Sequence, residues 1–183
     1  MEAKLSLLIL IMQKLYSQLI GMPVVTEYSP SPVCLVRDVV IDPETGKVVA
    51  LRVKRDSVIA PLDIERINNA VIIADQDRII PLHDILRVKN VIDMNIPVIG
   101  QRVIAERSKT LLGRVVDYEI DTTHMTLHSI HVAKVFFFFR FQELIISSRS
   151  IVKISRSAIT VKNTHAVCER EKSGARSVMP AVQ

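Results

Sequence analysis

The sequence predicts a mostly β protein built from two tandem small β-barrels, joined by a short helical linker and followed by a disordered C-terminal tail. One observation is a repeat: Asp38-Val39-Val40-Ile41-Asp42 returns as Asp117-Tyr118-Glu119-Ile120-Asp121, at an offset of 121 − 42 = 79 residues. Self-similarity at a fixed offset indicates a duplicated domain. The other observation is a close succession of short β-branched runs bounded by turn residues, which is typical of small barrels and sandwiches.

The repeat divides the 183-residue chain into five segments. We expect an apolar N-terminal segment (residues 1–16), a first barrel (17–80), a linker helix (81–95), a second barrel (96–163) and a disordered tail (164–183). Each barrel is close to the lower size limit for a self-sufficient core. Hydrophobic residues make up 49% of the chain and aromatic residues only 4%. Two small cores built from Val, Ile and Leu are therefore expected.

A β-hairpin over residues 37–53 is the strongest local signal. Pro43 presets φ for a turn and Gly46 can adopt the positive φ that closes it, so Asp42, Pro43 and Gly46 are expected to be structural turn residues. In the strand that follows, Val49, Leu51 and Val53 alternate with Ala50, Arg52 and Lys54. This alternation predicts one buried face and one exposed face.

The second copy repeats this hairpin over residues 114–120 and 126–132. Its turn near Asp121 contains neither Gly nor Pro, so we expect Asp121 to be the turn residue of a looser connection. Further along the chain, residues 150–154 match residues 63–67 at an offset of 151 − 64 = 87. The second copy has therefore gained 87 − 79 = 8 residues, near a run of phenylalanines. The remaining expected elements are strands over 58–60, 70–73, 136–141, 143–146 and 158–162, and short links over 63–67 and 150–154.

The segments outside the barrels have distinct compositions. Leu82, Ile85 and Leu86 have the spacing of an amphipathic helix, which predicts the linker. Residues after Asn163 are polar and are expected to be disordered. Leu5–Met12 is apolar apart from one serine, but a membrane helix needs about 20 residues. No signal-peptide cleavage pattern follows, so we expect a short element packed on the first barrel, with a weak membrane anchor as the alternative.

The positive charge is concentrated in the second half of the chain. Residues 1–92 carry 11 Lys+Arg and 11 Asp+Glu, whereas residues 93–183 carry 24 − 11 = 13 Lys+Arg and 19 − 11 = 8 Asp+Glu. Such asymmetry can mark an anionic partner, although spaced cations also form an ordinary solvated face. Between Leu144 and Cys168 the sequence contains no Asp or Glu but four cations: Arg149, Lys153, Arg156 and Lys162.

Two cysteines, Cys34 and Cys168, do not make a disulfide framework. This usage favours a reducing compartment, and a cytoplasmic location is expected.

Three sequence features occur in a recognisable order: Leu19-Ile20-Gly21-Met22-Pro23-Val24, the Asp-Pro-x-x-Gly-Lys-Val hairpin and, in the second copy, Ile99-Gly100-Gln101-Arg102-Val103 with Leu112-Gly113-Arg114. In these features the chain resembles a bacterial tandem PRC-barrel protein. The resemblance covers residues 17–163. This barrel forms part of the photosynthetic reaction centre H subunit and the C-terminal half of the ribosome maturation factor RimM. The resemblance implies a docking domain; the chain departs from those proteins in lacking the other RimM domain and the membrane helix of the H subunit.

Motifs for catalysis are missing from the sequence. It has no P-loop, no G-x-G-x-x-G, no G-x-S-x-G and no H-E-x-x-H, so we expect a non-enzymatic protein without a cofactor. The pairs Asp38/Asp42 and Asp117/Asp121 are interpreted as turn carboxylates rather than an active site. A zinc site at His124, His128 and His131 is the weaker alternative to three ordinary surface histidines, because no cysteine completes a tetrahedral set.

The run Phe136-Phe137-Phe138-Phe139-Arg140-Phe141 distinguishes the second copy. We expect a buried strand between the two barrels; the alternative is an exposed edge that binds a partner or a second copy of the chain.

The leading hypothesis is therefore a module that docks a protein partner, with a ribosome- or RNA-associated factor as the alternative and a homodimer as a further option. The residues expected at the partner surface are Phe136, Phe138, Arg149, Lys153, Arg156 and Lys162.

Overall fold

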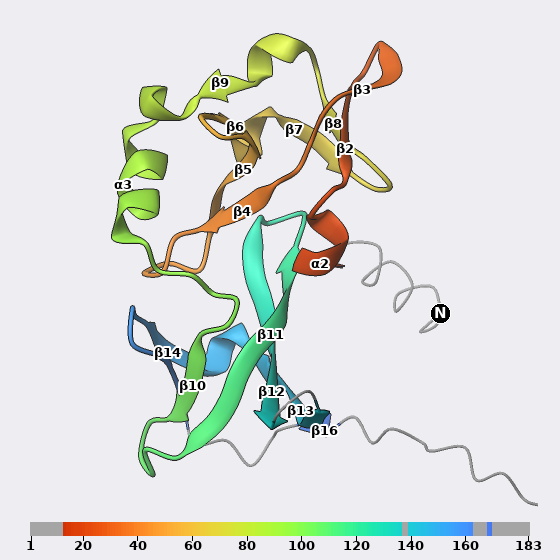
Figure 1. Cartoon of the computed structure of the whole chain (residues 1–183). Coiled ribbons are helices and arrows are strands. Elements are labelled where there is room, and N and C mark those ends of the chain that lie inside the picture. The colour runs from red at the N-terminus through yellow and green to blue at the C-terminus, as the bar shows by residue number, and fades with distance from the viewer. Residues whose placement is uncertain (1–12, 137–138, 163–167, 170–183) are drawn as a thin grey trace, which may run out of the picture.

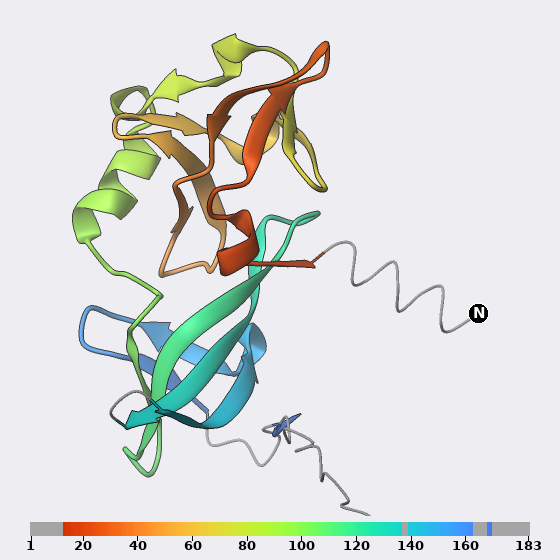
Figure 2. The ribbon, with the colours of Figure 1, turned by 45° about the vertical axis from the view of Figure 1, so that its right-hand side comes forward.

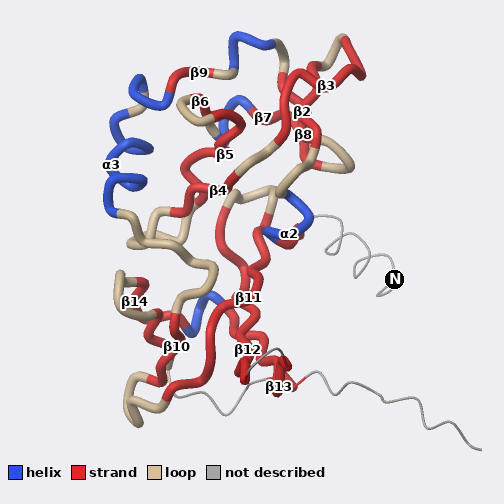
Figure 3. The backbone as a smooth tube through the Cα atoms, viewed as in Figure 1, coloured by secondary structure: helices blue, strands red, loops and turns tan. Residues whose placement is uncertain are grey.

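The computed structural model describes residues 13–136, 139–162 and 168–169. Strands dominate this part of the chain, with a few short helices between them (Figure 3). They form one eight-stranded sheet and two four-stranded sheets. The mostly β class predicted from the sequence is confirmed.

The first half of the chain holds the two four-stranded sheets (Figure 1). In one of them β2 and β8 are parallel neighbours, with Val24 opposite Val71. In the other, β4 and β5 form the predicted hairpin, with Asp38 opposite Arg52. The first sheet has the order β3 (Ser29–Leu35), β2 (Pro23–Thr26), β8 (Val71–Ile73), β7 (Ile64–Ile67), and the second β4 (Asp38–Ile41), β5 (Val48–Lys54), β6 (Ser57–Ile59), β9 (Ile80–Pro81).

The second half repeats these pairings within the larger sheet. β10 and β15 are parallel, with Val103 opposite Ile159, and Asp117 on β11 lies opposite His131 on β12. The order along the sheet is β14 (Ile151–Ile154), β15 (Ile159–Val161), β10 (Arg102–Ala105), β11 (Leu111–Asp121), β12 (Thr126–Phe136), β13 (Phe139–Ser147), β16 (Cys168–Glu169).

Individual hydrogen bonds also recur at the offset of 79. Gly21 N–H donates to the Val36 carbonyl oxygen at 2.8 Å, and Gly100 N–H donates to that of Val115 at the same distance. In both halves a glycine with positive φ therefore lies two residues before a strand: Gly21, with φ of 81°, precedes β2, and Gly100, with φ of 77°, precedes β10.

Two segments expected as links are strands. A 3-10 turn, η1 (Pro61–Asp63) or η4 (Ser148–Ser150), precedes β7 or β14. Each of these strands pairs with the next one along the chain, β7 with β8 and β14 with β15. The pairing gives hydrogen-bond partners to backbone N–H and C=O groups that would stay unpaired in an irregular link.

The second hairpin turn is not looser than the first. Met125 has φ of 49° at the position equivalent to Gly46, where φ is 69°. Asp121 Oδ1 accepts hydrogen bonds from Thr123 N–H at 2.8 Å and His124 N–H at 3.0 Å. These hydrogen bonds stabilise the turn although Met125 adopts a left-handed conformation, which costs a residue other than glycine roughly 1 kcal/mol or more.

Both ends of the described chain pair with the second half. β1 (Gln13–Leu15) is antiparallel to the end of β11. The apolar run Leu5–Met12, expected to pack on the first barrel, lies outside the described residues. In the expected disordered tail, Cys168 and Glu169 form β16 on the edge of β13. The rest of the tail lies outside the described residues.

Four helical segments complete the described part of the first half. They are α2 (Tyr16–Leu19), η2 (Gln76–Arg78), η3 (Leu82–Asp84) and α3 (Leu86–Met94). No helix in the described ranges is long and apolar enough to cross a membrane.

Helix α3 covers the outer face of β4, β5 and β6. Val88 and Val91 are buried against Val40, Ala50 and Val58. Leu86, expected on the buried stripe, is 70% exposed instead. Ala50, expected on the exposed face, is fully buried because α3 lies over it.

A single large core joins the two halves, in place of the two separate cores expected. Buried residues of both halves, among them Ile41, Val48, Ile120 and Leu127, belong to one cluster. The hairpin tips also bond reciprocally: Val48 N–H donates to Met125 O and Leu127 N–H to Gly46 O, both at 2.8 Å. Since 48 + 79 = 127 and 46 + 79 = 125, equivalent residues meet across a local two-fold axis.

Candidate functional site

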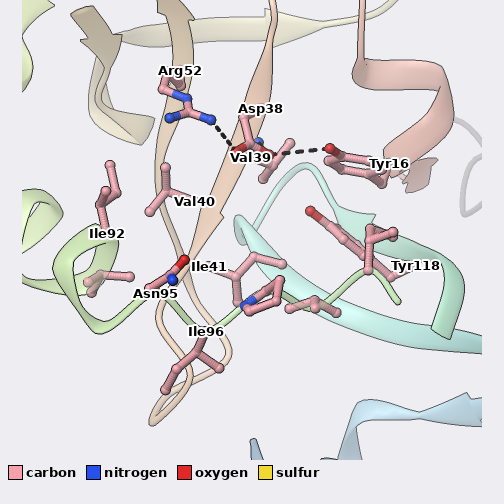
Figure 4. A pocket seen from close by; sticks show the side chains of 14 residues that line it. Tyr16, Asp38, Val39, Val40, Ile41, Arg52, Ile92, Asn95, Ile96 and Tyr118 are labelled. Carbon is pink, nitrogen blue, oxygen red and sulfur yellow. Dashed lines mark hydrogen bonds and ion pairs between the residues drawn. The ribbon is translucent and has the colours of Figure 1, made fainter. Parts of the chain in front are cut away.

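A hydrogen-bonded carboxylate, Asp38, lies where the two halves meet. Its Oδ2 accepts a hydrogen bond from Arg52 at 2.7 Å, and its Oδ1 accepts from the Tyr16 hydroxyl at 3.3 Å and from Val39 N–H at 2.9 Å. Figure 4 shows Asp38 between Arg52 on β5 and Tyr16 on α2. With both oxygens accepting hydrogen bonds, Asp38 holds Arg52, Tyr16 and the backbone of Val39 together.

The Asp38 network borders a cavity of about 300 Å³, which we term the inter-half cavity. Ile96, Pro97 and Ile99 from the segment after α3 form part of its apolar wall, and Tyr118 enters from β11 of the second half. Figure 4 shows Ile96 and Tyr118 around one space, with Arg52 at the side away from Ile96. The cavity thus joins an apolar wall to a charged rim.

Both tyrosines of the cavity are held in the protonated form. Burial raises the pKa of Tyr118 strongly, and the neighbouring Tyr16 ring adds to the effect. Burial also raises the pKa of Tyr16, with Asp38 contributing in the same direction. The two ring centroids lie 4.8 Å apart. These phenols supply packing and hydrogen bonds rather than acid–base chemistry near neutral pH.

Beside the cavity lies a second recess, of about 490 Å³, whose lining consists of Arg37, Arg52, Lys54 and Arg55. We term it the cation pocket. Arg52 and Lys54 lie near the end of β5, where its pairing with β6 is irregular, and both line this recess. Arg37 is held next to them, since its N–H donates to the Arg52 carbonyl oxygen at 2.7 Å. Arg52 also lines the inter-half cavity, so the two recesses adjoin.

Three of these four cations have no acidic partner among the described residues. Arg52 is paired with Asp38, whereas Arg37, Lys54 and Arg55 form no ion pair with a described carboxylate. All three are exposed. The pocket therefore retains most of its positive charge.

The cation pocket was not predicted from the sequence. Charge was compared between the two halves of the chain, and the positive and negative side chains of residues 1–92 cancel. The signal was local: three of the four residues 52–55 are cationic. Arg37 joins them only through the pairing of β4 with β5, which brings residue 37 beside residue 52.

The cations predicted in the second half do not form one site. Lys162 N–H donates to the Ser150 carbonyl oxygen at 2.8 Å, which places residue 162 near Arg149 at one end of β14. Arg156 follows the other end of β14 and donates from Nε to the Met94 carbonyl oxygen at 2.8 Å, anchoring the end of α3. Lys153 is exposed on β14 between them.

The three histidines have separate partners. His124 Nδ1 is 2.9 Å from Asp121 Oδ2, His128 Nε2 is 3.1 Å from Gln13 Nε2, and His131 is buried with Nδ1 at 3.9 Å from Glu143. Within the described residues no group of three or more His, Cys, Asp or Glu side chains could hold a metal ion.

The paired aspartates divide into two kinds. Asp42 Oδ1 accepts from Glu44 N–H at 2.9 Å inside the first turn, as Asp121 does in the second. Asp117 instead ties the halves together, since Ser17 donates to it from N–H at 3.2 Å and from Oγ at 2.5 Å.

The described ends of the phenylalanine run, Phe136 and Phe139, lie away from the contact between the halves, contrary to the expected position between the two barrels. Thr126, at the start of β12, bridges to Lys47 of the first half. Ten residues further along an extended strand, Phe136 is roughly 33 Å away at about 3.3 Å per residue. Figures 1 and 2 agree in placing this end of β12 at the far end of the second half. Phe136 closes β12 opposite Phe139, whereas Phe137 and Phe138 lie outside the described residues.

Comparison with known families bears on the first half of the chain. Residues 12–94 match the family model of the PRC-barrel domain. No curated protein matches the chain. The matched range includes β1 through α3 and every residue of the cation pocket. Residues 12–94 of this chain are therefore a PRC-barrel domain.

Proposed function

We propose that the chain is a non-enzymatic tandem PRC-barrel protein that docks a protein partner. The second barrel, over residues 96–163, is supported by the strand pairings and hydrogen bonds that recur at the offset of 79. Helix α3 and the segment that follows it would be the linker, which packs on the first barrel and is anchored to the second by Arg156.

The single observation that carries the docking function is the junction of the inter-half cavity with the cation pocket at Arg52. A surface that combines a small apolar recess with unpaired positive charge can hold an extended segment of another protein. The polar groups there are already in use, because both Asp38 oxygens accept hydrogen bonds and both phenols stay protonated. This supports a binding role rather than an enzymatic one.

We place the protein in the cytoplasm. Cys34 is a free thiol, and burial raises its pKa while Lys54 acts in the opposite direction. A thiol without a disulfide partner is compatible with a reducing compartment.

The test is affinity capture with the full chain, compared between the natural protein and a variant with Arg37→Glu, Lys54→Glu and Arg55→Glu. A protein retained by the natural chain and lost with the variant should then be purified and titrated by calorimetry. Direct binding of the purified pair at micromolar or better affinity is expected. If every captured protein fails to bind directly once purified, the docking function is wrong.

A ribosome- or RNA-associated role is the second candidate. Two features favour it: the cation pocket of the first half and the exposed cations near η4, where Arg149 lies close to Lys162. Binding of this kind weakens steeply with salt because counterions are released from the phosphates. Sedimentation with ribosomes and binding to rRNA, measured at about 50 and 200 mM salt, test it. Absence of binding at the lower salt concentration would exclude this role.

A further inference from the structure

We propose that the cation pocket and the inter-half cavity together bind an acidic protein segment. Carboxylates of the segment would lie on Arg37, Lys54 and Arg55, and an adjacent apolar side chain would enter the inter-half cavity. This inference rests on the docking function proposed above and specifies the chemistry of the partner.

The fold does not require the cations of the pocket. The positions equivalent to Arg37, Arg52, Lys54 and Arg55, each 79 residues later, carry Val116, His131, Ala133 and Lys134. The same strand pairing forms there, with Asp117 opposite His131. A cluster of like charges is unfavourable unless an anion neutralises it. The second half keeps one lysine, Lys134, and no arginine at these four positions. The clustering of charge in the first half is therefore best explained by an anionic ligand.

The arrangement favours carboxylates on a peptide over the phosphates of a nucleic acid. Single-stranded nucleic acids are commonly held by bases that stack on exposed aromatic rings. The aromatic side chains of the inter-half cavity are Tyr16 and Tyr118; Tyr118 is 2% exposed and Tyr16 packs on it. The rest of the cavity lining is largely aliphatic, with Val40, Ile92 and Ile96 among its residues. Recognition of acidic motifs by clustered arginines, with an apolar neighbour in a pocket, suits this surface.

Arg52 links the two parts of the proposed site. Its guanidinium is held by Asp38 on one side, which fixes the group at the boundary of the two recesses. A planar guanidinium with five donors can bind a second carboxylate while it keeps the first. Arg52 would then contact the segment between its acidic and apolar residues.

The experiment uses the full chain and fluorescence anisotropy of a labelled ten-residue peptide with four consecutive glutamates followed by two leucines. Saturable binding is expected. A peptide with glutamine at the four acidic positions should bind at least tenfold more weakly, and one with alanine for both leucines several-fold more weakly. If the glutamine peptide binds equally well, charge recognition is wrong. If the alanine peptide binds equally well, the cavity takes no part and the two-part site is wrong.

The variant that tests the site is Arg37→Glu with Lys54→Glu and Arg55→Glu. Because all three side chains are exposed, the fold should be retained, which circular dichroism checks; a set with glutamine at the same positions serves if the reversal unfolds the chain. We expect affinity for the acidic peptide to fall by about tenfold to a hundredfold, from three lost surface ion pairs.

A matched variant carries the same change in net charge elsewhere: Arg102→Glu, Lys109→Glu and Lys134→Glu. These exposed cations lie in the second half, outside the cation pocket. Affinity should change less than threefold. Equal losses in the two variants would show a non-specific charge effect and overturn the inference.

Competition separates this inference from the alternatives. A ten-nucleotide oligouridylate should displace the peptide only at much higher concentration; tighter binding of the oligonucleotide would assign the pocket to nucleic acid and overturn the inference. If the acidic peptide fails to bind while the purified captured partner still binds the natural chain directly, docking stands and this inference alone fails.

Discussion

Glycine at position 113 is required by the close approach of β11 and β12, and Gly113→Ala tests this in the second half of the chain. A Cβ atom at residue 113 would lie 2.5 Å from the carbonyl oxygen of Ala133 and 2.8 Å from its carbonyl carbon. Backbone atoms cannot rotate away as a flexible side chain can, so the strands must separate locally. Gly113 also has φ of 150°, which side chains rarely adopt.

The expected loss combines two contributions. Forcing an extra carbon into a packed site costs about 1–3 kcal/mol, and a backbone conformation unsuited to a side chain costs about 1–3 kcal/mol. We expect a total of roughly 2–4 kcal/mol, because local separation of the strands relieves part of each contribution. For a chain of this size the melting temperature should fall by about 5–15 °C. Thermal and urea denaturation followed by circular dichroism measure both quantities.

Gly100→Ala is the matched control within the same half. Gly100 has φ of 77°, but a Cβ atom added at this residue would meet no other atom within 4 Å. Only backbone strain is expected there, about 1 kcal/mol. If Gly113→Ala is no more destabilising than Gly100→Ala, the close approach of β11 to β12 at Ala133 is wrong.

Three further predictions concern the core, the turn and the cation pocket. Leu51 is fully buried and Leu62 is 99% exposed, so Leu51→Ala should lower the free energy of unfolding by about 2–5 kcal/mol and Leu62→Ala by less than about 0.5 kcal/mol; similar urea midpoints would contradict the assigned core. Burial alone would raise the pKa of Asp42, but hydrogen bonds from Arg87, Glu44 N–H and Thr45 outweigh burial, and the pKa of Asp42 is lowered. The ionised Asp42 therefore stabilises the folded chain above the unfolded-state pKa, and this stabilisation is lost as the pH falls through the folded-state pKa. Arg87→Met should therefore cost about 1–2 kcal/mol at pH 7, and this difference should narrow between about pH 5 and pH 2; a difference in urea stability that is constant with pH would be inconsistent with it. Asp38→Asn removes a negative charge beside Arg52, while the amide oxygen can still accept the Arg52 hydrogen bond. Binding of the acidic peptide should therefore tighten by about threefold; weaker binding by anisotropy would contradict the proposed role of Arg52.

Local signals predicted the parts of the fold that depend on neighbouring residues. The first hairpin follows from Pro43 and Gly46, whose φ preferences fix a turn without help from the rest of the chain. The second hairpin kept its tight turn with Met125 in the place of glycine, because Asp121 supplies hydrogen bonds that propensity alone does not include.

Contacts between distant residues were beyond local patterns. Ala50 alternates as an exposed residue, yet α3, about 40 residues later, buries it. The pairing of β1 with β11 spans more than 100 residues, and the merged core depends on how the two halves meet. The cation pocket combines a short charged run with Arg37, which only sheet pairing brings near.

The reciprocal bonds between the hairpin tips have a consequence for how the two halves can differ. Contacts of this kind, in which residue i meets j and j meets i, are those of a symmetric dimer. In such a dimer every substitution occurs twice, and association depends on concentration. In a single chain the pairing persists at any dilution, and a change in one half need not appear in the other. One half can thus accumulate charge at Arg37 and Lys54 while its counterpart keeps neutral residues and serves as structural support.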